Sequence, residues 1–177
     1  MSDAADALWN FAVRLYSMDG VAQACLGLQE RHDADVTILI YAAWRGGVYG
    51  VATSDADAAL ARSRVSAWHG EIVRPLRAVR QRMKHGPHPA PDPRTHGLRE
   101  QLKALELETE KVELAVLAEL VGCAPATAHP LPAHELLTSL AVMLGAGPED
   151  GLDEETRAEL VRIAAAAASI SAPRTPG

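Results

Sequence analysis

The chain has 177 residues, of which 48% are hydrophobic and 23% charged, with a formal net charge of −6. This composition is ordinary for one globular domain, and the negative charge excludes general attraction to nucleic acid or anionic membranes. Two cysteines are too few for a disulfide scaffold. We see no basic and apolar leader at the N-terminus, and the apolar run at 38–44 is too short to span a membrane. We therefore expect a cytoplasmic protein without membrane contact.

Periodicity predicts helices over about 4–18, 21–32, 36–45, 55–84, 98–121, 134–144 and 153–168. Aromatic side chains occur only in the first part of the chain, which indicates a compact core there. They are Trp9, Phe11, Tyr16, Tyr41, Trp44, Tyr49 and Trp68. We expect Asp19, Asp33 or Asp35, Ser54 and Asp153 to cap the helices that follow them.

The segment 36–45 has two possible structures. Its β-branched residues would suit a buried strand, but no other segment offers a partner, so we predict a helix followed by a turn at Gly46, Gly47 and Gly50. In the helix 55–84, Pro75 either introduces a kink or begins a second helix.

Two long amphipathic helices flank a proline-rich linker at 85–97, which predicts an antiparallel hairpin over 55–121. The apolar stripe of the first helix is Ala61, Val65, Trp68, Ile72, Leu76, Val79 and Met83. The stripe of the second has coiled-coil spacing: Leu98, Leu102, Leu105, Thr109, Val112 and Val116. We expect these stripes to carry the pairing, with a basic flank on the first helix facing an acidic flank on the second.

The predicted fold is therefore all-α: a three-helix N-terminal base, a long helical hairpin and two short C-terminal helices. We divide the chain into a helical domain at 1–121, a C-terminal helical pair at 122–168 and a disordered tail at 169–177.

Several motifs resemble a proteobacterial family of uncharacterised small helical proteins, over about residues 8–120. These are LWxFAxxxY from Leu8, GVxxACLxLQ from Gly20, DVxxL from Asp35, WxxEIVxPLRxxR from Trp68 and KAxELExE from Lys103. The resemblance implies an all-helical fold and no known activity. This chain has Thr37 where the family usually has Asn, which argues against a polar role at that position.

Two surfaces are candidates for function. The first is a partner-binding ridge of Arg74, Arg77, Arg80, Lys84, Glu106 and Glu110, although such charges more often form a solvated face. The second is a pocket lined by Trp9, Tyr16, Tyr41, Trp44, Trp68 and His69, although such rings more often only pack together. We favour a protein-interaction or assembly role, with a protein partner or a second copy, over a small-molecule binder or enzyme.

We expect no catalytic residue, cofactor or metal ion. Helix capping explains the Asp-Ala-Asp pairs at 33–35 and 55–57, and the glutamates of 106–113 have the pattern of a solvated surface. His85, His88 and His96 fit no standard zinc spacing. His69 has no visible partner and is expected to be partly exposed, whereas Cys25 is expected to be a buried, inert core residue.

Overall fold

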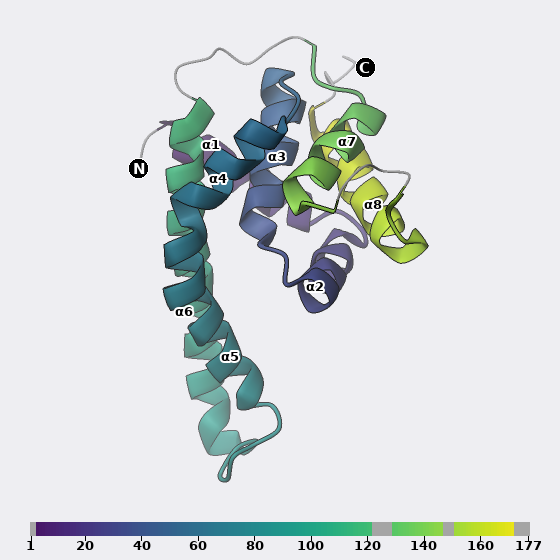
Figure 1. Ribbon diagram of the computed structural model, residues 1–177. Coiled ribbons are helices and arrows are strands. Elements are labelled where there is room, and N and C mark those ends of the chain that lie inside the picture. The colour runs from purple at the N-terminus through teal and green to yellow at the C-terminus, as the bar shows by residue number, and fades with distance from the viewer. Residues whose placement is uncertain (1–2, 122–128, 147–150, 172–177) are drawn as a thin grey trace, which may run out of the picture.

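The computed structural model describes residues 3–121, 129–146 and 151–171, and this part of the chain is helical and contains no strand (Figure 1). The elements are α1 (Asp3–Tyr16), α2 (Val21–His32), α3 (Val36–Tyr49), α4 (Asp55–Trp68), a π-helical turn (His69–Val73), α5 (Arg74–Arg82), α6 (Pro93–Ala118), a 3₁₀ turn (Glu119–Val121), α7 (Ala133–Leu144) and α8 (Glu154–Ser171). The all-α prediction is confirmed. No helix in the described ranges is both long and apolar enough to cross a bilayer.

Helix α3 lies at the centre of the molecule, with α7 and α8 on one side and α6 on the other (Figure 1). It is buried on nearly every face from Val36 to Trp44 because almost every residue there is apolar, which is the pattern of a central helix. The two C-terminal helices belong to the same core: Leu136, Leu140 and Leu160 are fully buried in it.

Helix α3 is four residues longer than the sequence predicts, because Gly46 and Gly47 are helical and only Gly50, at φ 65°, ends it. A Cβ at position 46 would lie 2.5 Å from the Cδ2 atom of Leu136, so glycine here permits close approach of α7. The expected turn at Gly46 and Gly47 is therefore wrong: close packing, not a turn, accounts for Gly46.

Most of the predicted caps are present. Asp35 accepts a hydrogen bond from the backbone N–H of Thr37, Ser54 and Asp57 form a reciprocal capping box, and Asp153 accepts from Thr156. Asp19 does not cap α2, because Gly20 occupies that position in a left-handed conformation without a side-chain bond.

Other boundaries also differ from the predicted ones. Helix α6 begins at Pro93 instead of Leu98, because Asp92 and Thr95 form a capping box and proline suits the first turn. Helix α8 continues past Ala168 to Ser171, and the rest of the predicted tail lies outside the described residues. Cys123 also lies outside them.

Helices α4 and α5 run antiparallel to α6 and form the predicted hairpin, whose far end extends away from the body of the molecule (Figure 1). A π-helical turn at 69–73 comes directly before α5, and Pro75 lies in the first turn of α5. A proline cannot donate the usual helical hydrogen bond, and a wider turn next to it accommodates this loss.

The hairpin interface follows the predicted apolar stripes only in part. On α6 the side chains of Glu106, Thr109 and Glu113 are buried, whereas Leu98, Leu105 and Val112 remain 46–55% exposed. The α6 stripe is therefore divided: Thr109 is buried and Leu102 and Val116 are partly buried. Leu98, Leu105 and Val112 lie at the edge, while Glu106 and Glu113 face inward. The stripe of the first helix is divided similarly: Ala61 and Val65 are buried, but Val79 is 51% exposed.

The close contact at Gly46 gives a first prediction. Gly46→Ala should lower the free energy of unfolding by about 1–3 kcal/mol, because the new methyl group overpacks the α3–α7 contact at Leu136. Gly97→Ala is the matched control: no atom lies within 4 Å of a Cβ there, so the substitution should stabilise α6 by up to about 1 kcal/mol. Urea denaturation followed by circular dichroism measures both, and equal effects would contradict the described packing.

Candidate functional site

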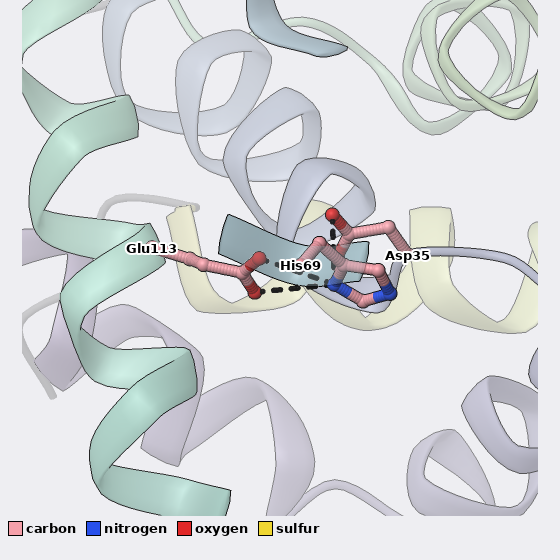
Figure 2. Close-up of side chains that lie close together, drawn as sticks. All are labelled: Asp35, His69 and Glu113. Carbon is pink, nitrogen blue, oxygen red and sulfur yellow. Dashed lines mark hydrogen bonds and ion pairs between the residues drawn. The ribbon is translucent and has the colours of Figure 1, made fainter. Parts of the chain in front are cut away.

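Three titratable side chains from distant parts of the sequence meet between the hairpin and the core (Figure 2). Asp35 is the N-cap of α3, His69 begins the π-helical turn, and Glu113 lies on the inner face of α6. We call this group the Asp35–His69–Glu113 cluster.

The imidazole of His69 lies between the two carboxylates. Its Nδ1 atom is 3.1 Å from Oε1 of Glu113 and 3.3 Å from Oδ2 of Asp35. The hydroxyl of Thr37 lies 2.6 Å from Oδ1 of Asp35 and 3.2 Å from Oε2 of Glu113. The sequence argument against a polar role for Thr37 is therefore wrong in this chain.

The cluster is withdrawn from solvent. The side chain of Glu113 is 0% exposed, and those of His69 and Asp35 are 11% and 13% exposed. The expectation of a partly exposed histidine without a partner is wrong. The expectation of a solvated glutamate surface holds for Glu108, which is exposed, but is wrong for Glu106 and Glu113, which are buried, and Glu113 pairs with His69.

Burial and the charges within the cluster raise the pKa values of Glu113 and His69. Burial, reinforced by the charge of Asp35, raises the pKa of Glu113. Burial acts to lower the pKa of His69, but the hydrogen bond to Glu113 and the charges of both carboxylates outweigh it, so this pKa is raised. With the imidazole protonated and both acids ionised, the cluster would still carry one excess negative charge.

A cleft of about 280 Å³ opens beside the cluster. Asp35 and His69 form part of its wall, together with residues of α4 and the end of α7. Two arginines, Arg62 and Arg74, also line it. The contacts of the His69 ring with Glu113 and Asp35 are both made by Nδ1. The cluster thus borders a space that a small ligand could enter.

The chemistry open to the cluster follows from its atoms. One ring nitrogen and two carboxylates, with ligand atoms all within 4.8 Å of one another, are donors of the kind that hold a divalent metal ion. A histidine held by buried carboxylates can also take up and release a proton near neutral pH. Within the described residues, this is the one group of three or more such donors.

The predicted partner-binding residues are engaged within the chain. Arg77 binds Glu106 at 2.7 Å and also pairs with Glu110, and Arg80 binds the other oxygen of Glu106 at 2.5 Å. These four form a network between α5 and α6. Arg74 pairs with Asp33 at 2.8 Å on the surface, and Lys84 is exposed. A partner-binding role for this set stays a prediction.

The predicted aromatic pocket is divided by the fold. Trp9 and Tyr16 border an apolar groove of about 320 Å³ between α1, α3 and α6, and His69 borders the cleft beside the cluster. Tyr41 and Trp44 are buried in the core and line neither space. Trp68 is 39% exposed and donates from its indole N–H to the backbone carbonyl of Thr109.

Cys25 is buried, as predicted. Burial raises the pKa of its thiol to about 11, which favours the protonated and less nucleophilic form near neutral pH.

From the sequence, we predicted only a capping role for Asp35 and only a surface position for Glu113. One signal was available for Glu113: Glu106, Glu110 and Glu113 form a helical ridge, and an arginine-rich helix precedes the linker. No comparable signal pointed to a functional role for Asp35, because helix capping alone accounts for an aspartate directly before a helix.

All the residues of the cluster lie in a region that matches a known family. A model described as "Protein of unknown function (DUF2390)" matches residues 7–117, and the chain belongs to this family. The match includes most of α1, all of α2 to α5 and nearly all of α6, but not α7 or α8. The predicted membership in an uncharacterised family is confirmed, and the proteobacterial origin stays a prediction.

No curated protein and no solved structure matches the chain. The function must therefore be argued from this structure.

The cluster predicts a pH dependence of stability. Since folding raises the pKa of His69 above its ordinary value of 6.5, its contribution to stability is complete below that value and is lost as the pH rises through the raised pKa. Glu113 acts in the same direction at lower pH, and the charge of Arg77 opposes the shift of His69. Urea unfolding between about pH 6 and pH 9 should show stability falling with pH in the wild type. His69→Gln should flatten the curve, and an unchanged slope in this variant would contradict the assignment.

The arginine–glutamate network predicts that removing a single carboxylate charge strongly destabilises the fold. Glu106→Gln should destabilise the protein by about 3 kcal/mol, because Arg77 and Arg80 are partly buried and each would lose an ionised partner. The control is Arg94→Gln, at a pair whose arginine side chain is 77% exposed, where no measurable change is expected. Chemical denaturation compares them, and a near-neutral Glu106→Gln would show that the network does not hold the hairpin.

Proposed function

We propose that this protein acts by protein contact and assembles with a second copy of itself through the hairpin of α4, α5 and α6. The observation that carries the proposal is an exposed apolar row with coiled-coil spacing. Leu98, Leu105 and Val112 are seven residues apart on α6, so they share one face, and each is about half exposed.

The neighbouring helix supplies a second row. Trp68, Ile72 and Val79 follow helical spacing and are 37–51% exposed. We call the six residues of the two rows the apolar edge. The hydrogen bond from Trp68 to the carbonyl of Thr109 supports placing the two rows on the same side of the hairpin, because Thr109 lies between Leu105 and Val112 on α6.

The charged network explains why the edge stays uncovered. Glu106, Arg77 and Arg80 occupy the space between the helices that the apolar stripes would otherwise fill. The hairpin therefore pairs partly by charge and hydrogen bonding, besides burial of Ala61 and Val65, and leaves large apolar side chains in water. Grouped apolar side chains on a protein surface are a common mark of an interaction site.

A second copy suits this edge better than an unrelated occupant. A two-fold axis brings identical surfaces together, and two hairpins joined along their edges complete a four-helix bundle in which both apolar rows are buried. The end of the hairpin extends beyond the body (Figure 1), which leaves room for another hairpin beside it. A cytoplasmic location is part of this proposal.

A second candidate function is the binding of a small ligand. The apolar groove beside Trp9 and Tyr16, of about 320 Å³, is as large as the smaller small-ligand pockets of proteins. The groove is lined by Leu107, which lies on the face of α6 away from Leu105. A substitution at Leu107 therefore addresses the groove and leaves the apolar edge unchanged.

Light scattering coupled to size-exclusion chromatography tests the assembly. The wild-type protein should elute as a dimer at micromolar concentration, and Leu105→Glu combined with Val112→Glu should give a monomer, because charges would be buried in the new interface. Leu107→Glu is the matched control, since Leu107 has the same type, helix and exposure (48% against 50% for Leu105) but faces elsewhere; it should remain dimeric. A monomeric wild type, or equal behaviour of the two variants, would overturn the proposal.

A further inference from the structure

We propose that the Asp35–His69–Glu113 cluster binds one divalent transition-metal ion, with Zn²⁺ as the representative species. The site is independent of the proposed dimer: it lies between the hairpin and α3, and the apolar edge is formed by other residues.

The spacing of the donor atoms fits a metal ion. Ligands that bind at about 2.1 Å in tetrahedral or octahedral geometry are about 3.0–3.4 Å from one another. The distances of 3.1 Å from Nδ1 of His69 to Glu113 and 3.3 Å to Asp35 lie in this range. A modest movement of the Asp35 and Glu113 carboxylates would therefore complete the three-ligand set.

The charge balance points the same way. The imidazole has one proton at Nδ1 to offer to two carboxylates, and the Thr37 hydroxyl has one proton for the same two groups. Arg77, whose charge acts on His69, is already bound to Glu106 and Glu110. Of the two arginines that line the cleft, Arg74 pairs with Asp33 and Arg62 donates to the carbonyl of Met143. A divalent cation with a neutral imidazole neutralises both carboxylates, whereas a single proton on His69 neutralises one. Burial makes this difference costly.

The donor set also selects the class of ion. A ring nitrogen with two carboxylates suits zinc or another first-row transition metal, while Mg²⁺ and Ca²⁺ favour oxygen ligands alone. Three protein ligands leave at least one coordination position, and the cleft beside Asp35 and His69 provides space for a small ligand there.

Each member of the cluster is held by a different element. Asp35 is fixed by its cap bonds to the N–H and hydroxyl of Thr37 at 2.9 and 2.6 Å. Glu113 is fixed by burial on α6, and His69 by the π-helical turn. Binding a metal ion would thus join α3, the π-helical turn and α6 and should stabilise the folded chain.

Calorimetric titration with Zn²⁺ tests the site. The full chain is used with His85, His88 and His96 replaced by alanine in every sample, so that the linker contributes no imidazole. One ion per chain should bind, and His69→Gln or Glu113→Gln should weaken the affinity by more than about tenfold. The control is His134→Gln, whose side chain is 80% exposed and lies far along the chain; it should bind as the parent does. Mg²⁺ and Ca²⁺ should not compete.

A second measurement follows thermal unfolding with and without Zn²⁺, because an ion that binds only the folded chain stabilises it. The melting temperature of the parent should rise with Zn²⁺, and this rise should be lost in His69→Gln. Absence of Zn²⁺ binding by the parent, or equal affinity in parent and His69→Gln, would overturn the proposal. Either result would leave the dimer proposal standing, because the latter depends on Leu105 and Val112.

Discussion

The structure depends on which face of α6 meets its neighbours. Glu106, Thr109 and Glu113 occupy the buried line of this helix, and each meets a specific polar group from the preceding helices: Arg77 and Arg80, the indole of Trp68 by way of the Thr109 carbonyl, and His69. Buried charge is costly unless it is paired, so these partners fix the rotation and register of the hairpin. The position of the apolar edge follows from that rotation.

The same helix connects the two candidate functions. Its inner face carries Glu113 to the cluster, and its outer edge carries Leu105 and Val112 into solvent. Hydrophobic residues would have been sufficient to pair the two helices, as in many helical bundles. The use of charged residues instead leaves apolar side chains exposed at the edge of the hairpin and titratable groups between the helices.

Burial decides the chemistry of the cluster. A histidine beside two carboxylates on a surface would be screened by water and would differ little from the free residues. Here the carboxylate of Glu113 is wholly covered and Asp35 and His69 are nearly so, so the excess negative charge must be met by protons or by a cation. Membership in a family of unknown function gives no guide to which of these the protein uses, and the cluster residues all lie within the matched region.

The sequence by itself determined the helices, most of the caps and the hairpin, because these follow from residue spacing and from bonds between near neighbours. Ser54 and Asp57 illustrate this: a capping box involves only residues three positions apart. The sequence could not determine which face of each long helix turns inward. Both the apolar stripe and the charged ridge were available on α6, and the partners that decided between them, Arg77 at 29 residues and His69 at 44 residues from their glutamates, are brought near only by the fold. The meeting of Asp35, His69 and Glu113 was decided by the tertiary structure for the same reason, since no local pattern relates an N-cap, a π-helical turn and the middle of a distant helix.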